Sequence, residues 1–202
     1  MARVKPKRHG VVTDMTAMCD VAFLLLTFFI LTTQFKKPDV EQIKPPSSIS
    51  EKLLPDASLM TVNVTPEGKF YFQPVENGNE RMQILDNMGK KYGIPAFSQK
   101  EKVAFTRVQA IGVPMSQLKS YLNMPEDEQK AYKSPTGVPL DSTNKQLIDW
   151  VEQSLKVNPD YKLAIKGDVN TKYPKVKNLF EGLRDIKFLK FWLITSQEGK
   201  PN

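Results

Sequence analysis

The sequence from Asp14 to Thr33, DMTAMCDVAFLLLTFFILTT, is an apolar run that begins after Asp14 and has one carboxylate, Asp20, inside it. As a helix, the roughly 19 residues that follow Asp14 would extend about 28 Å, close to the thickness of the hydrocarbon core of a bilayer. A helix at the surface of a soluble protein needs a polar face, and this run has none that is wide enough. The sequence therefore predicts a transmembrane helix over residues 14–34.

The charges that flank this run differ between its two sides. Four basic residues lie within residues 3–8, whereas Lys36 and Lys37 are soon followed by two acids. By the positive-inside rule, we expect residues 1–13 in the cytoplasm and the bulk of the chain on the other side of the membrane. The alternative is a cleaved signal peptide, but no small-x-small cleavage pattern follows the run. A lipoprotein signal would have its apolar stretch before Cys19, not after it.

Asp20 raises the free energy of inserting this segment into a membrane. A charged Asp at the centre of a membrane costs about 2.5–3.5 kcal/mol on insertion scales. Burial disfavours the charged form of a carboxylic acid, so the default interpretation is an acid that gains and loses a proton. The alternative is a residue that caps the helix or reaches the membrane surface, because Asp20 lies only about five residues into the segment.

Polar residues recur at intervals of seven along this stretch, at Thr13, Asp20, Thr27 and Gln34. Thr16, four residues before Asp20, joins them on one helical face. Such a polar line should face protein or a wet pathway, and one helix cannot enclose a pathway. We therefore expect partner helices from another subunit, from a copy of this chain, or from both. The hydroxyl of Thr27 can also bond the carbonyl four residues earlier, so its polarity alone proves little.

The remaining composition excludes several functional classes. The formal net charge is +7, but the lysines are interleaved with acids and no nucleic-acid-binding signature is present. Cys19 and His9 are the single cysteine and the single histidine, which leaves little for a zinc site or a cysteine nucleophile. The region after the apolar run has no histidine, no G-x-S-x-G and no phosphate-binding loop. We expect neither an enzyme nor a bound cofactor.

Residues 35–58 separate the apolar run from the rest of the chain. They contain four prolines together with charges and serines, the composition of an extended, partly flexible linker. Their few apolar side chains could instead pair as an added strand on a partner. Residues 59–202 then form one exported domain.

The pattern of this domain is that of a small α+β sandwich. Alternation over residues 60–65, the turn TPEGK and two further aromatic residues predict a β-hairpin. A helical face over residues 147–155 follows, with a cap expected at Ser142 or Thr143. A strand at YKLAIKGD, a helix started by Pro174 and a strand at KFLKFWLITS complete the order β-β-α-β-α-β, with an insert between the hairpin and the first helix. We expect the helices on one face of the sheet.

The run DMTAMCDVAFLLLTFFIL resembles the transmembrane signature of the ExbD/TolR biopolymer-transport family, D-M-T-P-M-x-D-V-x-F-L-L-L-x-F-F. Ala17 stands where the family commonly has proline, and Cys19 takes an apolar position. The segment LAIKGDVNTKYPKVKNLFEGLRDIKFLKFWLITS is also similar to the C-terminal half of the family. Asp168 and Tyr173 match positions commonly seen there, and the simplest role for Asp168 is that of a turn or cap residue.

Residues 77–140 depart from the usual length of the family's domains, and we interpret them as an inserted region. Its glycines, prolines and acidic patches favour short helices joined by loops. The apolar set Leu118, Tyr121 and Leu122 indicates that this region packs on the domain.

The resemblance implies a subunit of an inner-membrane motor that is driven by the proton motive force. Family members sit as a dimer of helices inside a ring of a larger partner, ExbB or TolQ, and act on a TonB-like or TolA-like protein. Asp20 matches the carboxylate that carries protons, which are the coupling ion. Thr27, Thr16 and Thr13 are candidates for the proton path or for the helix interface. TonB-linked and TolA-linked transport both fit the sequence.

The alternative function belongs to a different class. The chain would be a single-pass, membrane-anchored protein whose periplasmic domain binds a partner, and Asp20 would be an assembly device with no proton-carrying role.

Overall fold

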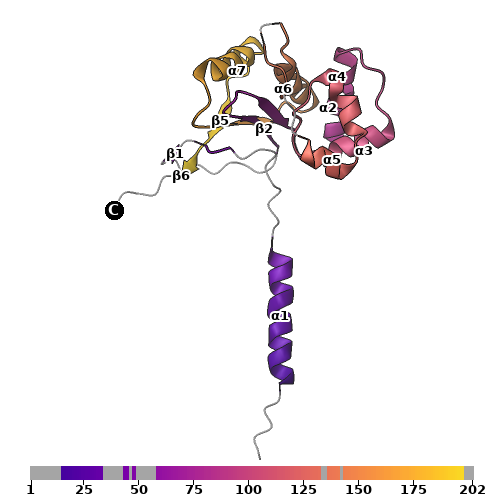
Figure 1. Cartoon of the computed structure of the whole chain (residues 1–202), viewed down its shortest axis with the longest axis vertical. Coiled ribbons are helices and arrows are strands. Elements are labelled where there is room, and N and C mark those ends of the chain that lie inside the picture. The colour runs from indigo at the N-terminus through magenta and orange to yellow at the C-terminus, as the bar shows by residue number, and fades with distance from the viewer. Residues whose placement is uncertain are drawn as a thin grey trace, which may run out of the picture. The chain divides into compact units, whose positions relative to one another are not determined.

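A computed structural model describes residues 15–33, 43–45, 47–48, 58–132, 136–141 and 143–197. The chain divides into two compact units, residues 1–38 and 39–202 (Figure 1). The described part of the first unit is one helix, α1 (Thr16–Thr32). The second unit is an α+β domain around a mixed four-stranded sheet, in agreement with the predicted fold class.

The main sheet has the strand order β3-β2-β4-β5. The bounds of its strands are β2 (Leu59–Val64), β3 (Phe70–Gln73), β4 (Lys162–Gly167) and β5 (Phe191–Ile194). Strands β2 and β3 form the predicted antiparallel hairpin, whereas β4 is parallel to β2 and β5 is parallel to β4. The hairpin turns at Gly68, whose φ of 78° lies in the left-handed region that glycine adopts without strain.

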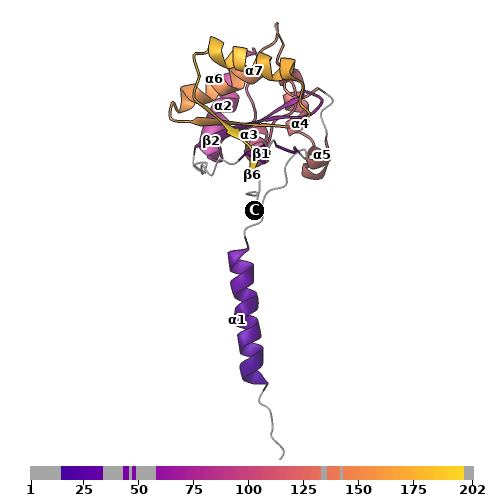
Figure 2. The ribbon, with the colours of Figure 1, turned by 90° about the vertical axis from the view of Figure 1, so that its left-hand side faces the viewer.

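Two helices lie over one face of this sheet, as predicted (Figure 2). Their bounds are α6 (Gln146–Val157) and α7 (Tyr173–Asp185). The β2–β4 register pairs Met60 with Leu163 and Val62 with Ile165, and all four side chains are buried. Because side chains alternate along a strand, these pairs share one face, and the helices cover it. The order β-β-α-β-α-β of the sequence analysis is confirmed.

The two helix starts agree with the sequence to different degrees. Pro174 lies in the first turn of α7, where its fixed φ suits the helix and its missing N–H costs nothing. The predicted cap of α6 is wrong at Thr143, because the helix begins at Gln146 and its N-cap residue, Lys145, makes no capping bond through its side chain. Ser142 lies outside the described residues. The side chain of Gln146 instead accepts a hydrogen bond from the backbone N–H of Met115, at 2.9 Å.

The predicted inserted region consists of short helices joined by loops. Their bounds are α2 (Gly78–Lys91), α3 (Gln99–Arg107), α4 (Met115–Leu122) and α5 (Glu126–Ala131). The first helix starts at the side chain of Asn77, which accepts from the N–H groups of Asn79 and Glu80. The second starts with a capping box between Ser98 and Glu101, which satisfies two backbone donors at once.

This region is part of the hydrophobic core of the domain. Leu118 and Leu122 are buried and Tyr121 is half-buried, so the predicted packing is confirmed. Residue Ile111 exchanges two backbone hydrogen bonds with Phe72 of β3, at 2.8 and 2.7 Å. The region therefore covers the outer edge of β3, which would otherwise offer unpaired backbone groups.

Arg81 ties two of the helices together. From α2 it donates hydrogen bonds to the carbonyl oxygens of Thr106, at 2.6 Å, and of Val108, and its guanidinium lies over the ring of Phe105. These carbonyls belong to the end of α3, where the helix itself leaves acceptors without partners. Burial lowers the pKa of Arg81 to about 10, and the nearby Glu76 opposes this shift, so the side chain is charged at neutral pH.

Replacing Arg81 by Met should lower the free energy of unfolding by about 2–3 kcal/mol, because buried carbonyls lose a charged donor. Urea denaturation of the full-length chain, followed by fluorescence, measures this change. The control is Arg107→Met, which removes the ion pair between two exposed side chains, Arg107 and Glu126, and should cost less than about 1 kcal/mol. Equal losses in the two variants would contradict the role of Arg81.

Part of the linker is more ordered than predicted. Residues Ser47–Ser48 form a short strand, β1, that pairs in parallel with β6 (Ser196–Gln197) near the C-terminus. The sequence analysis considered an added strand made by apolar linker residues on a partner. The strand that the structure describes contains serines and pairs within the chain.

Candidate functional site

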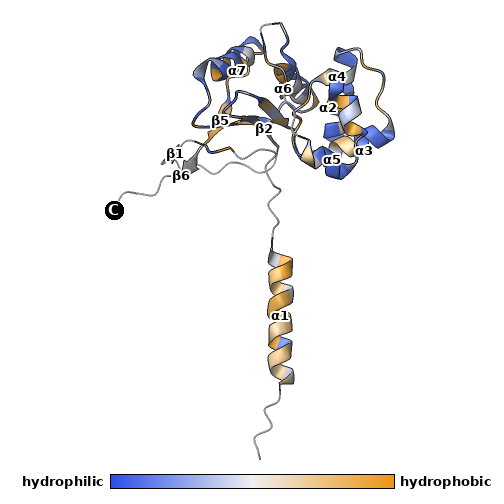
Figure 3. Cartoon of the chain, in the orientation of Figure 1, coloured by the Kyte–Doolittle hydropathy of each residue, from blue (hydrophilic) through white to orange (hydrophobic). Residues whose placement is uncertain are grey.

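Helix α1 has an apolar surface that the described part of the chain does not cover. Its 17 residues extend about 26 Å at 1.5 Å per residue. Large apolar side chains between Met15 and Leu31 are exposed all along it, and the helix has no buried residue. Figure 3 colours most of α1 as hydrophobic. Such a surface is stable only where lipid or other protein covers it.

Within the described residues, no helix is both long enough and apolar enough to cross a membrane. Both ends of the predicted span, Asp14 and Gln34, lie outside those residues.

The predicted site residues of α1 share one face of the helix. Thr16, Asp20 and Thr27 are separated by four and seven residues, so that they lie within about 40° of each other around the axis. Thr13 lies outside the described residues. Asp20 is exposed, and Thr27 is partly covered by its own helix.

Thr27 satisfies its hydroxyl locally, as the sequence analysis allowed. It donates to the carbonyl oxygens of Phe23, at 3.0 Å, and Leu24, at 2.9 Å. The hydroxyl keeps its acceptor capacity, which a proton path could use. Thr32 is bonded in the same way to Phe28, at 2.8 Å. Asp20 differs, because a carboxylate cannot donate to a carbonyl of its own helix.

Asp168, for which the sequence predicts a turn or cap role, lies in a second polar cluster at the end of β4. Asp168 is 8% exposed and accepts hydrogen bonds from the N–H groups of Lys44, at 2.8 Å, and Asn170, at 2.9 Å. The Asn170 bond confirms the predicted turn role of this residue. The sequence could not predict the Lys44 bond, because its donor is a backbone N–H, which every residue type except proline has.

The edge strand β5 carries a third candidate surface. In the sheet it pairs with β4 on one side, and no strand among the described residues lies on the other. Leu193 of β5 and Leu189 just before it are 60% and 69% exposed, and Tyr173 at the start of α7 is also exposed. An open edge with apolar side chains is suited to pairing with another chain.

An apolar helix that carries an acid, followed by a small α+β domain, is the domain organisation expected of a biopolymer-transport subunit. The family model for the biopolymer transport protein ExbD/TolR matches residues 6–198, which is nearly the whole chain. The chain belongs to the ExbD/TolR family. This confirms the resemblance, and the match runs through the predicted inserted region. Comparisons with curated proteins and with solved structures find no match.

Family membership supports a role in biopolymer transport. The family is generally associated with membranes, and its members interact with ExbB- or TolQ-type and TonB- or TolA-type proteins.

Proposed function

We propose that this chain is a subunit of an inner-membrane motor that uses the proton motive force to energise transport across the outer envelope. The observation that carries the proposal is Asp20, a single carboxylate on a largely apolar helix of an ExbD/TolR family member. A charge in such a place is costly and is retained where it has a task.

The proposed topology follows from the sequence. Residues 14–34 span the inner membrane once, residues 1–13 stay in the cytoplasm, and residues 35–202 form the periplasmic linker and domain. The exposed apolar side chains along α1 support this arrangement, because lipid and partner helices would remove them from water. The excess of basic residues before the run supports the direction of insertion.

Asp20 is the proton carrier in this proposal. The protonated acid is neutral and tolerates an apolar surrounding, whereas the carboxylate needs polar groups or water. A ring of larger subunits around α1 would present polar and apolar positions in turn, so that each proton transfer favours a new position of the helix. Thr27, Thr16 and Thr13 would line the path or the helix interface. No enzymatic site and no cofactor other than the proton is required.

Three protein partners belong to the proposal. The first is the ExbB- or TolQ-like ring, and the second is a further copy of this chain, since a dimer would fill the ring. The third is a TonB-like or TolA-like protein that receives the motion in the periplasm. The open edge of β5 and its exposed Leu189 and Leu193 support contact with another periplasmic chain. The alternative is a single-pass anchored binding protein without a proton-carrying role.

Dependence on the proton gradient tests the proposal. In cells that lack the chain, energised transport should stop, and the wild-type chain should restore it. A protonophore applied while ATP is maintained should then abolish the restored transport. Transport that continues under the protonophore would exclude the motor and favour the anchored binding protein.

A further inference from the structure

Two residues that precede the domain in sequence are bound to its sheet. The N–H of Lys44 donates to Oδ2 of Asp168, at 2.8 Å, and the N–H of Val169 donates back to the carbonyl oxygen of Lys44, at 3.1 Å. The neighbouring Ile43 is only 8% exposed. The backbone at residue 44 is thus held by one donor and one acceptor from the end of β4, beside a buried apolar side chain.

Two further contacts strengthen this arrangement. The carboxylate of Asp168 is held in place for its bond to Lys44, because the N–H and the side-chain amide of Asn170 donate to its other oxygen, Oδ1, at 2.9 and 3.2 Å. Three residues beyond Lys44, β1 pairs with β6 and attaches the same segment a second time. The attachment is nevertheless small beside the hydrophobic core of the domain. It can therefore open without unfolding the domain.

We propose that Ile43, Lys44, Asp168 and Val169 form a releasable clamp that sets the length of chain between α1 and the domain. With the clamp closed, residues 34–42 are the chain between Thr33 and the clamp. Fully extended, they reach about 35 Å. With the clamp and β1 released, the connection runs to β2 at Leu59, and its reach grows to roughly 90 Å. Release therefore adds about 50 Å to the distance at which the domain can meet a partner.

A change of pH in the neutral range does not open this clamp. Hydrogen bonds from the backbone of Asn170 and of Lys44 hold the pKa of Asp168 below its usual value. The side chain of Lys44 adds to this effect, and the carboxylate of Glu67 is the nearby acid. The stabilisation from the ionised carboxylate is therefore present above the usual pKa of Asp and is lost only as the pH falls through the lowered one. Tension on the linker, or a partner that competes for the end of β4, is the remaining trigger.

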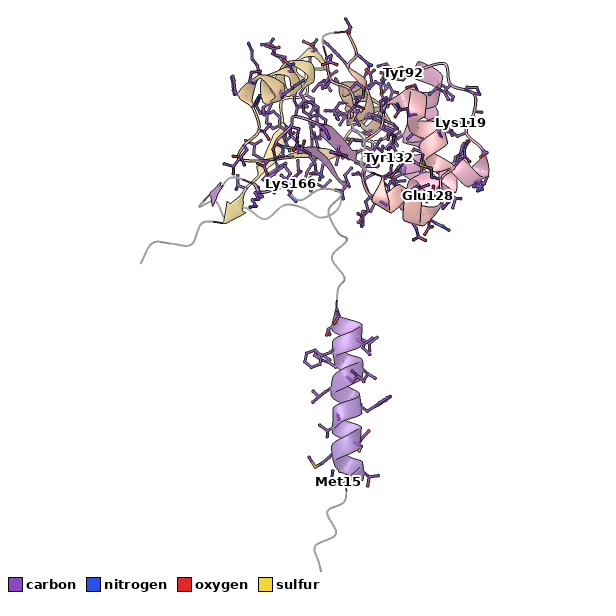
Figure 4. All side chains as sticks on the ribbon, viewed as in Figure 1. Met15, Tyr92, Lys119, Glu128, Tyr132 and Lys166 are labelled. Carbon is purple, nitrogen blue, oxygen red and sulfur yellow. The ribbon has the colours of Figure 1, made fainter. Side chains whose placement is uncertain are left out.

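The experiment uses the full-length chain in lipid nanodiscs, with spin labels on the native Cys19 and on a cysteine that replaces the exposed Glu128 of α5 (Figure 4). The test variant is Lys44→Pro, which deletes the donor N–H. Near-ultraviolet circular dichroism checks that its domain stays folded. The matched control is Lys44→Ala, which keeps this N–H. Asp168→Ala removes the acceptor from the other side of the clamp. Amide hydrogen exchange at Val169 reports the second bond of the clamp.

In the wild type and in Lys44→Ala, we expect the same distance distribution and a protected Val169 amide. In Lys44→Pro, protection at Val169 should be lost and distances should shift to longer values, by up to about 15 Å while β1 stays paired with β6 and by up to about 50 Å where that pair also separates. Asp168→Ala should match Lys44→Pro as long as near-ultraviolet circular dichroism shows a folded domain. Equal distributions in Lys44→Pro and Lys44→Ala would overturn the proposal. Dilution with unlabelled chains removes the distances between two copies, and the shift between Lys44→Ala and Lys44→Pro should survive it. A shift that disappears on dilution would also overturn the proposal, because the clamp would then join two copies.

The clamp deepens the proposed function and rests on it for the anchoring of α1. The two fail separately, because the distance measurement needs neither a proton gradient nor a partner. The expected distance shift, measured in nanodiscs, would support the clamp. If transport in cells then continued under the protonophore, the clamp would stand and the proposed motor function would be wrong.

Discussion

Replacing Asp20 by Asn is expected to reduce energised transport to background while the chain still assembles with its partners. Asn has nearly the size of Asp and keeps a polar side chain on the same face of α1, but it cannot take up and release a proton. If proton transfer at this residue drives the motor, no step of the cycle can proceed. If Asp20 only helps the helices to associate, much of the function should remain.

Two readouts make this result decisive. Transport is measured in cells whose only copy of the chain is the variant, and assembly is measured as the amount of ring subunit that co-purifies with it. The control, Asp39→Asn, makes the same chemical change in the linker and should keep transport near the wild-type level. Normal transport in Asp20→Asn cells would remove the proton-carrying role. Loss of both transport and co-purification would point to the assembly role of the alternative.

Trp150→Ala should be the most damaging single change in the α+β domain. Trp150 is fully buried on α6 and stacks between Phe72 of β3 and Phe105 of α3, with ring centroids 6.0 and 5.8 Å away. The loss of a buried Trp side chain costs about 3–5 kcal/mol, a large part of the 5–15 kcal/mol that stabilises a typical domain. Because the ring joins the sheet to the predicted inserted region, both should unfold in one less stable transition.

The second tryptophan provides a control. Trp192 of β5 is only partly buried, so Trp192→Ala should cost clearly less than Trp150→Ala. Trp150→Phe should fall between the wild type and Trp150→Ala, because it keeps a stacked ring and removes the indole N–H, which has no hydrogen-bond partner. Urea denaturation of the full-length chain gives all three values. Unfolding of the sheet and the inserted region in two separate transitions in the wild type would contradict their common core.

Much of the fold could be predicted because its signals are local. The alternation in β2 and β4 and the apolar faces of α6 and α7 each lie within a few residues, and Pro174 fixes the start of α7. The cap at Thr143 was wrong because a capping residue is chosen by the contacts of the whole first turn. Here Gln146 bonds the backbone of a distant helix, and no local pattern reports that.

The polar face of α1 could be predicted to a similar degree, while its role as a site stays a prediction. Asp20 and its polar face follow from the spacing of polar residues on one helix, and the family match supports the same segment. The clamp at Asp168 was not predictable, because its partner is the backbone of Lys44, 124 residues earlier in the chain. The role of Arg81 in ending α3 was hidden for the same reason, since its acceptors are backbone carbonyls 25 and 27 residues away.

By itself, the sequence determined the acid-bearing apolar helix, the order of strands and helices, and the family. These depend on residue type and short-range periodicity, which any stretch of chain carries on its own. Only the tertiary structure decided that the linker is fastened to β4 and that residues 77–140 share the core and cover the edge of β3. Those features depend on backbone groups and side chains that come into contact only after the chain has folded. Contacts between residues far apart in the chain produce no periodic pattern in the sequence.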